Sequence, residues 1–145
     1  MASSARIPAH CSRSGLCHSR GMFEHPVPVR WRDVDALDHV NHAVFLTYLE
    51  EGRDRFYTQV MGRDCLYVVV RIEIDLKAEI GRDHRQVTVR IEAERLGTTS
   101  LTTREAILTE AGEVAAQARV VTVLWDAERH QPVPFTAAER ARLGA

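Results

Sequence analysis

After one long stretch with a helical period, the apolar residues of this chain change to a period of two, and this change restricts the folds open to it. Between about residues 42 and 61 they recur at spacings of four, seven and four, which is typical of one buried helix face. These residues are Phe45, Leu49, Phe56 and Val60, with Gly52 on the same stripe. Gly62 follows where a left-handed residue commonly ends a helix. The pattern predicts one helix roughly 30 Å long, at 1.5 Å per residue.

Strand patterns lie before and after this helix. The expected strands are residues 27–33, 68–77, 87–94, 99–109 and 114–126. In the second of them apolar residues alternate with mostly charged ones, which predicts a half-buried strand. The residues assigned to its buried face are Val68, Val70, Ile72, Ile74 and Leu76.

Two polar turns predict how these strands pair. GRDH at residues 81–84 predicts an antiparallel hairpin of 68–77 with the strand after it, and EAGE at 110–113 joins the last two strands. We therefore expect a meander of four strands, with residues 27–33 as an early strand at an edge.

A sheet of five strands with one apolar face needs a cover, and the chain offers little to provide one. Besides the long helix we expect only a short helix over residues 137–143, capped by Thr136 and Glu139. The fold class is therefore α+β, with an antiparallel five-stranded sheet wrapped around one long central helix in a single domain of residues 22–145. Because the sheet edges stay open, a homodimer or homotetramer is expected.

Composition excludes several classes of protein. The 145 residues carry a formal net charge of −1 and no apolar run near the length of a membrane span, so we expect neither nucleic acid nor a membrane as partner. Only Cys65 lies in the body of the chain, which favours a cytoplasmic protein without disulfides. Residues 1–21 are rich in serine and arginine and contain no acidic residue, so we expect a disordered extension, or a start site placed too early with Met22 as the natural start.

Several catalytic schemes lack their residues. After Met22 the only serine is Ser100, outside any GxSxG pattern, and Cys65 has no evident histidine partner. The glycines form no phosphate-binding loop. The remaining candidate is the loop RDVDALDHVNH at residues 32–42.

This loop has two readings. As a metal site it would offer Asp33, Asp35, Asp38, His39 and His42, but their spacing matches no strong zinc pattern, and polar residues before a helix are expected as caps. As a catalytic site it would use the free N–H groups of the helix start to polarise a carbonyl, with one aspartate as general base or nucleophile. Spacing does not decide which aspartate serves.

The segment RWRDVDALDHVNHAVFLTYLEEGR at residues 30–53 closely resembles the signature of hot-dog-fold acyl-CoA thioesterases of the 4-hydroxybenzoyl-CoA thioesterase family. Later segments agree in order: VVVRIEIDLKAEI, RLGTTSLT, GEVAAQARVVTVLWD and QPVPF. The resemblance covers residues 27–143 and implies a sheet wrapped around a central helix, assembled as dimers or larger.

The resemblance also implies roles for particular residues. The second aspartate of the D-x-D pair, Asp35, is the implied catalytic carboxylate. The backbone N–H groups near Asn41 and His42 would hold the thioester carbonyl, and Asp33 would fix the loop. The family usually has glycine where this chain has Asp38, and often a second asparagine where it has His42.

Related hot-dog thioesterases carry the carboxylate on the central helix, which makes Glu51 the rival of Asp35. The other reading of Glu51 is a salt bridge with Arg55, four residues on. By the same resemblance Arg95, Thr99 and Ser100 are candidate CoA contacts, although a plain strand bend at Gly97 explains the segment equally well.

The resemblance thus implies a cytoplasmic acyl-CoA thioesterase that needs no metal and no organic cofactor. The alternative from another class is a non-catalytic module that binds acyl-CoA, since one fold serves several functions. A hot-dog dehydratase is disfavoured because its Asp-x-Asn-Pro-x-His pattern is absent, and a metal-dependent hydrolase ranks last. Phe45, Tyr48 and Leu49 could line an acyl pocket or belong to the core.

Overall fold

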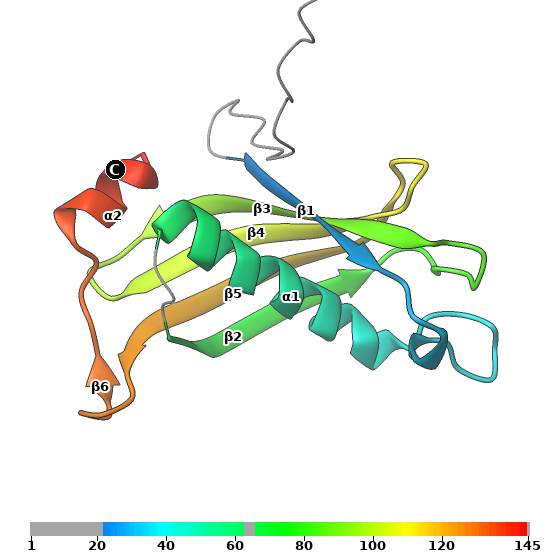
Figure 1. Ribbon diagram of the computed structural model, residues 1–145, viewed down its shortest axis with the longest axis horizontal. Helices are drawn as coiled ribbons and strands as arrows, with labels where there is room; N and C mark the ends of the chain where they lie inside the picture. Colours follow the sequence, from blue (N-terminus) through cyan, green and yellow to red (C-terminus); the bar gives the residue numbers. More distant parts are fainter. Residues whose placement is uncertain (1–21, 63–65, 145) are drawn as a thin grey trace, which may run out of the picture.

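The computed structural model describes residues 22–62 and 66–144, so the predictions for residues 1–21 and Cys65 lie outside the described residues. The elements are β1 (Met22–Pro28), a 3-10 turn η1 (Trp31–Asp33), α1 (His42–Met61), β2 (Tyr67–Leu76), β3 (Gln86–Leu96), β4 (Ser100–Leu108), β5 (Val114–Asp126), β6 (Gln131–Pro132) and α2 (Ala137–Arg142). One long helix crosses one face of an antiparallel sheet, which confirms the predicted α+β hot-dog architecture (Figure 1).

The long helix has the predicted limits. It ends at Gly62, which adopts φ +73°, a left-handed conformation that glycine reaches without strain. The short helix α2 is also as expected, because the Thr136 side chain and the Glu139 side chain cap each other's backbone N–H groups.

The first strand lies earlier than predicted, and a small sixth strand was not expected. β1 ends at Pro28, and residues 31–33 form the turn η1 instead of continuing the strand. The reason is local, because the Asp33 carboxylate accepts a hydrogen bond from the backbone N–H of Arg30 and so turns the chain. β6 pairs only with the end of β5.

The predicted hairpin between β2 and β3 is wrong. The strand order is β1-β3-β4-β5-β2, so β2 pairs with β5 at one edge, while β3 lies between β1 and β4. The meander of β3, β4 and β5 is as predicted. The connection from β2 to β3 is no tight turn, because Ile80 within it is fully buried and its carbonyl accepts a hydrogen bond from Val40 N.

The helix does not cover the inner sheet face evenly. It packs mainly on β1, β3 and β4. Gly52 permits the close approach to β3, because a Cβ atom there would clash with the side chain of Val89. Phe45, Tyr48 and Leu49 are buried in this core.

Strand β2 is consequently exposed on both faces, which corrects the prediction of a half-buried strand. In one copy of the chain Val70 is 58% exposed and Leu76 51% exposed. The register with β5 shifts between Val69 and Arg71, so a bulge changes the phase of the alternation. Val69, and not Val68 or Val70, therefore shares the inner face with Ile72, Ile74 and Leu76.

Within the described residues, no helix has the length and apolar character needed to cross a membrane.

A buried ion pair joins the helix to the sheet. Arg53 of α1 donates through Nη1 to Glu105 Oε2 of β4 at 2.6 Å, and both side chains are almost completely buried. The Thr103 hydroxyl donates to the other carboxylate oxygen at 2.8 Å. Burial raises the pKa of Glu105, whereas Arg53 and Thr103 act against this rise. Whether the Glu105 carboxylate is ionised therefore depends on its contacts with Arg53 and Thr103.

We predict that Arg53→Met destabilises the fold by about 3–5 kcal/mol at pH 7.5, because it leaves a buried carboxylate without its counter-charge. A raised pKa in the folded state means that the folded protein binds the proton more tightly than the unfolded chain. The deficit should therefore shrink as the pH falls from neutral towards the unfolded value of about 4.3. Urea unfolding at a series of pH values measures this.

Two further variants serve as controls for this prediction. Arg53→Met with Glu105→Gln should recover most of the loss, because no buried charge remains. Arg119→Met, which removes only an exposed pair with Glu94, should change stability little at any pH. A deficit of Arg53→Met that is independent of pH would contradict the assignment.

Candidate active site

The loop between η1 and α1 is closed on itself by backbone hydrogen bonds. Asp35 N donates to His39 O at 2.9 Å, and Val34 and Val40 form an isolated β-bridge. Asn41 N donates to Asp33 O at 2.9 Å, which brings the start of α1 beside the end of η1. The predicted residues Asp35, Asn41 and His42 therefore lie in one compact turn at the N-terminus of the helix.

Asp33 is the buried aspartate of this loop. Its Oδ2 atom accepts hydrogen bonds from Arg30 N and from the Tyr48 hydroxyl, both at 2.8 Å. Its carbonyl accepts the bond from Asn41. The prediction that Asp33 fixes the loop agrees with these contacts.

Asp35 is partly exposed. Its Oδ1 atom accepts from Leu37 N at 2.8 Å, a bond within the loop that orients the carboxylate. Among the hydrogen bonds of the described residues, none reaches Oδ2. One oxygen of Asp35 thus remains available for a substrate or a water molecule.

The start of α1 leaves one backbone donor for a ligand. Asn41 caps the helix, because its side chain accepts from Ala43 N at 2.9 Å and its carbonyl accepts from Val44 N. Asn41 N is bound to Asp33, whereas the N–H of the exposed residue His42 has no acceptor in the described part of the chain. A helix N-terminus favours negative charge at such a group. Of the two N–H groups predicted to hold a carbonyl, that of Asn41 is thus already bound, whereas that of His42 has no acceptor among residues 22–62 and 66–144.

Asp38 adopts φ +62°, a conformation that glycine takes more easily than a residue with a side chain. This explains why a glycine is usual here in the family that the sequence resembles. In this chain Arg82 holds the residue, since its backbone N–H donates to Asp38 O at 3.2 Å and its guanidinium pairs with the carboxylate at 2.6 Å. His39 is held to the same segment through Glu79, at 3.2 Å.

Glu51, the rival carboxylate, is bound by Arg30 and not by Arg55. Both of its oxygens accept from the Arg30 guanidinium, each at 2.8 Å. Such a bidentate pair is a strong, oriented contact between the chain after β1 and the helix. Asp35 has a free oxygen, whereas Glu51 has two bound ones.

The candidate CoA contacts lie at the opposite end of the molecule. Arg95 lies near the end of β3, Thr99 in the β3–β4 turn and Ser100 at the start of β4, beside the C-terminal segment and near the far end of α1 (Figure 1). There Gly97 N donates to Ser100 O, and Arg140 donates to Gly97 O. A single copy of the chain does not bring these residues to Asp35.

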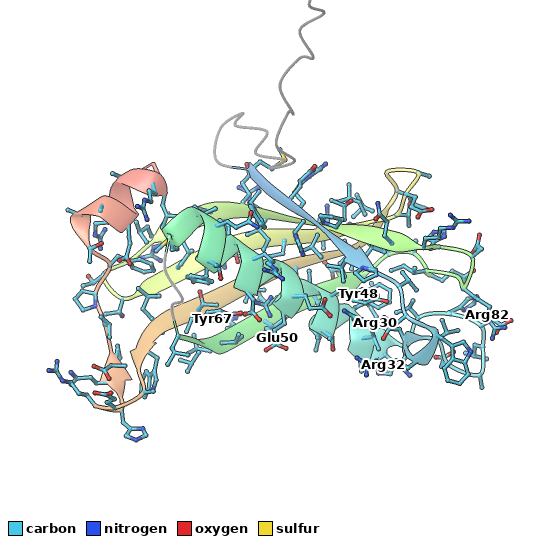
Figure 2. The ribbon with its side chains drawn as sticks, viewed as in Figure 1. Arg30, Arg32, Tyr48, Glu50, Tyr67 and Arg82 are labelled. Atoms are coloured by element: carbon cyan, nitrogen blue, oxygen red, sulfur yellow. The ribbon has the colours of Figure 1, made fainter. Side chains whose placement is uncertain are left out.

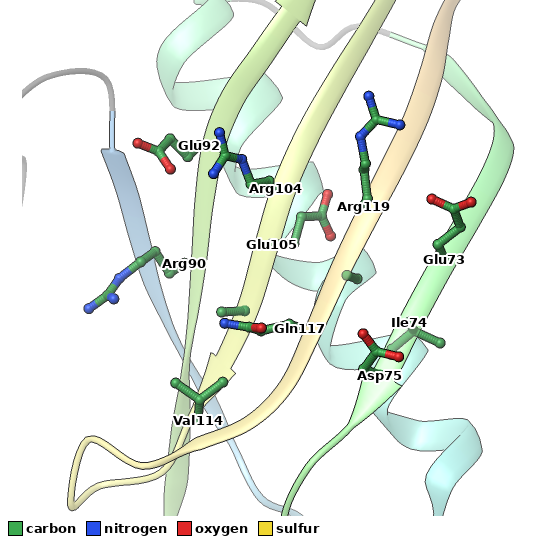
Figure 3. A pocket seen from close by; sticks show the side chains of 12 residues that line it. Glu73, Ile74, Asp75, Arg90, Glu92, Arg104, Glu105, Val114, Gln117 and Arg119 are labelled. Carbon is green, nitrogen blue, oxygen red and sulfur yellow. The ribbon is translucent and has the colours of Figure 1, made fainter.

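A separate hollow of about 840 Å³ lies on the outer face of the sheet (Figure 3). Its walls carry alternating arginines and carboxylates, and none of the predicted site residues lines it. Arg90 pairs with Glu24 at 2.8 Å and Arg119 with Glu94 at 2.7 Å. These arginines and carboxylates form ion pairs with one another, so the outer face of the sheet is a solvated ionic surface.

Sequence reasoning did not find the partners that hold the loop, Tyr48 and Arg82. Tyr48 carried a signal, because a tyrosine on an apolar helix stripe needs a hydrogen-bond partner when it is buried. Arg82 carried none, because its pairing with Asp38 depends on where the connection after β2 runs. In the described parts of the chain, no three histidine, cysteine, aspartate or glutamate side chains are grouped so that they could hold a metal ion.

Comparison with known proteins gives a consistent result. The sequence model of the thioesterase-like superfamily matches residues 29–143. A thioesterase from Thermus thermophilus, solved in complex with coenzyme A and Zn, is 33% identical with a TM-score of 0.72, and the match covers 84% of this chain and 97% of that one. The comparison with curated proteins gave no match.

Two further solved structures are similar. A protein from Bacillus stearothermophilus described as a predicted thioesterase is 28% identical with a TM-score of 0.75, over 86% of this chain and 95% of that one. A thioesterase-superfamily protein from Jannaschia sp. CCS1 is 25% identical with a TM-score of 0.75, over 83% of this chain and 80% of that one.

We predict that Asp38→Gly leaves the fold at least as stable as the natural chain. Glycine relieves a conformation that costs a non-glycine residue about 1–3 kcal/mol, while the exposed pair with Arg82 contributes at most about 1 kcal/mol. Arg82→Ala should be slightly less stable, because it loses the pair and keeps the strain. Thermal unfolding of both variants measures this, and a clear loss of stability in Asp38→Gly would contradict it.

Proposed function

The chain belongs to the thioesterase-like superfamily, and we propose that it is an acyl-CoA thioesterase, which hydrolyses the thioester of an acyl-CoA to a free acid and CoA. One observation carries the proposal. The free oxygen of Asp35 and the unpaired N–H of His42 belong to the same closed turn at the start of α1. The presence of coenzyme A in the Thermus thermophilus relative supports CoA as part of the substrate.

In the proposed reaction the thioester oxygen accepts a hydrogen bond from His42 N–H, which stabilises the negative charge that develops there. As a general base, Asp35 takes a proton from water while the water oxygen attacks the carbonyl carbon. The tetrahedral intermediate then expels the thiolate of CoA. As a nucleophile, Asp35 would attack the carbon itself and expel the thiolate of CoA, which leaves an anhydride that water hydrolyses. Both routes need the same free oxygen.

We propose that no metal takes part, because the carboxylate and histidine side chains of the loop are directed to separate partners. Asp33 binds Tyr48, Asp38 binds Arg82, and His39 binds Glu79. The Zn in the Thermus thermophilus complex belongs to that protein. A cytoplasmic location is also part of the proposal, and it rests on the cysteine content of the body of the chain.

The active form is proposed to be a homodimer paired through the β2 edges. The uncovered inner side chains of β2 offer an apolar strip, and an open edge strand favours pairing with a second copy. Trp31 and Leu37, which are 88% and 75% exposed beside the candidate loop, would also gain cover at such an interface.

A two-fold axis through antiparallel β2 strands would complete the site. In one copy Val68 and Ser100 both pair with Val123, so the β3–β4 turn lies at the start of β2. The candidate loop lies beyond the other end of β2, because Val40 and Asp38 bind the connection that follows it. Antiparallel pairing places the start of one β2 beside the end of the other. Arg95, Thr99 and Ser100 of one copy would then approach Asp35 of its partner.

We predict that Asp35→Asn lowers the rate of thiol release from acyl-CoA by about a hundredfold or more, on the order of what a lost general base costs. The assay uses aromatic, short-chain and long-chain CoA esters, each with and without EDTA, which should change nothing. Asp38→Asn is the matched control in the same loop, because asparagine tolerates a positive φ, and it should keep its activity within about twofold.

Other outcomes of this assay would overturn the assignment. Release by Asp35→Asn together with loss in Glu51→Gln would move the catalytic carboxylate to the helix. Binding of CoA esters by the natural protein without any release would favour a non-catalytic binding module.

We predict that Ile72→Lys, a charge on the inner face of β2, yields a folded monomer of about 16 kDa that has lost thiol release. Asp75→Lys, on the outer face of the same strand, should remain dimeric and active. Size-exclusion chromatography with light scattering, run beside the thiol assay, tests both. A natural protein that is monomeric and active would contradict the proposed dimer.

A further inference from the structure

Tyr48 is a completely buried tyrosine in the second turn of α1, and its hydroxyl bonds to a residue of the candidate loop. It donates to Asp33 Oδ2 of the candidate loop at 2.8 Å. Figure 2 labels Tyr48 beside Arg30, near the start of α1. Phenylalanine would fill the same apolar space, so packing alone does not account for the hydroxyl. Burial and the bond to Asp33 raise the pKa of Tyr48, which keeps the hydroxyl a donor at any assay pH near neutral.

Asp33 is the point where three segments meet. Its carboxylate binds the backbone of Arg30 after β1 and the side chain of Tyr48 on the helix. Its carbonyl binds Asn41 N, the residue directly before His42. Asp35 follows two residues later. A shift of Asp33 would therefore move the candidate carboxylate and the candidate carbonyl donor relative to each other.

A second contact supports the same junction. Arg30 binds Glu51 through two hydrogen bonds, and Glu51 lies one helical turn after Tyr48. The chain leaving β1 is thus tied to α1 at two successive turns. Tyr48 bonds to the Asp33 carboxylate from the helix, whereas Arg30, which carries the other tie, meets the same carboxylate through its backbone N–H at 2.8 Å and its guanidinium at 4.0 Å.

We propose that Tyr48 is a positioning residue, which acts through Asp33 to hold Asp35 and His42 N–H in the relative placement that thioester hydrolysis requires. The inference rests on the proposed function. It differs from a stabilising role, because misplacing reacting groups lowers the rate of the chemical step even when the fold and substrate binding persist.

Tyr57 provides a matched control on the same helix. It is as buried as Tyr48, and its hydroxyl also makes a short hydrogen bond, at 2.6 Å to the Thr122 hydroxyl of β5. This contact leads to the sheet and not to the loop. Tyr48→Phe and Tyr57→Phe each remove one buried hydroxyl and should lower the thermal unfolding midpoint by similar amounts.

The two variants should differ in catalysis. Tyr48→Phe is expected to lower kcat about tenfold or more with KM within about twofold, while Tyr57→Phe keeps both within about twofold of the natural protein. Asp33→Asn, whose side-chain oxygen still accepts from Tyr48, should retain more activity than Asp33→Ala. Equal kcat values in the two phenylalanine variants would overturn the inference.

A second readout does not need activity. Amide hydrogen exchange of Asn41, whose N–H donates to Asp33, should be faster in Tyr48→Phe than in Tyr57→Phe. If the natural protein released no thiol, the proposed function would fall, and exchange alone would decide the coupling. Unchanged protection of Asn41 in Tyr48→Phe would then overturn the inference as well.

Discussion

The narrow cover of the sheet determines much of this structure. One helix packs mainly on β1, β3 and β4, and it approaches the sheet closely because Gly52 adds no side chain against Val89. The buried pair of Arg53 and Glu105 holds the helix in that place. The edge strand β2 has no such cover within the described residues, and most of its apolar side chains stay exposed in one copy of the chain.

The candidate site separates two aspartates by environment. Asp33 is buried, and its Oδ2 atom and its carbonyl are occupied by Tyr48, Arg30 and Asn41, so its charge serves the loop. Asp35 uses one oxygen within the loop and keeps the other free. The helix start follows the same rule, because Asn41 caps the N–H groups of Ala43 and Val44, while that of His42 has no acceptor in the described part of the chain. Only hydrogen-bond donors and acceptors that are not already bonded within the fold are available to a substrate.

The parts of the fold that the sequence predicts are those set by neighbours along the chain. The limits of α1, the left-handed Gly62 and the capping box of Thr136 and Glu139 are all local, and each is confirmed. The predicted β2–β3 hairpin is wrong because strand pairing depends on distant partners. The buried Ile80 shows that the connection between these strands is not a tight turn. In the site, the motif marks Asp35 as the candidate, but the contacts of Tyr48 and Arg82 appear only when the chain is folded.

The pairing of β2 also has a consequence for how the chain folds. Tyr67 pairs with Leu124 and Leu76 with Ala116. Strand β2 can therefore join the sheet only when β5, the last long strand, is present. Contacts between distant segments form slowly, because the loop between them must close first. During synthesis β2 leaves the ribosome well before β5, and its apolar residues then have no partner within the chain. The same edge that we propose as a dimer contact is therefore the segment most open to aggregation while the protein is being made.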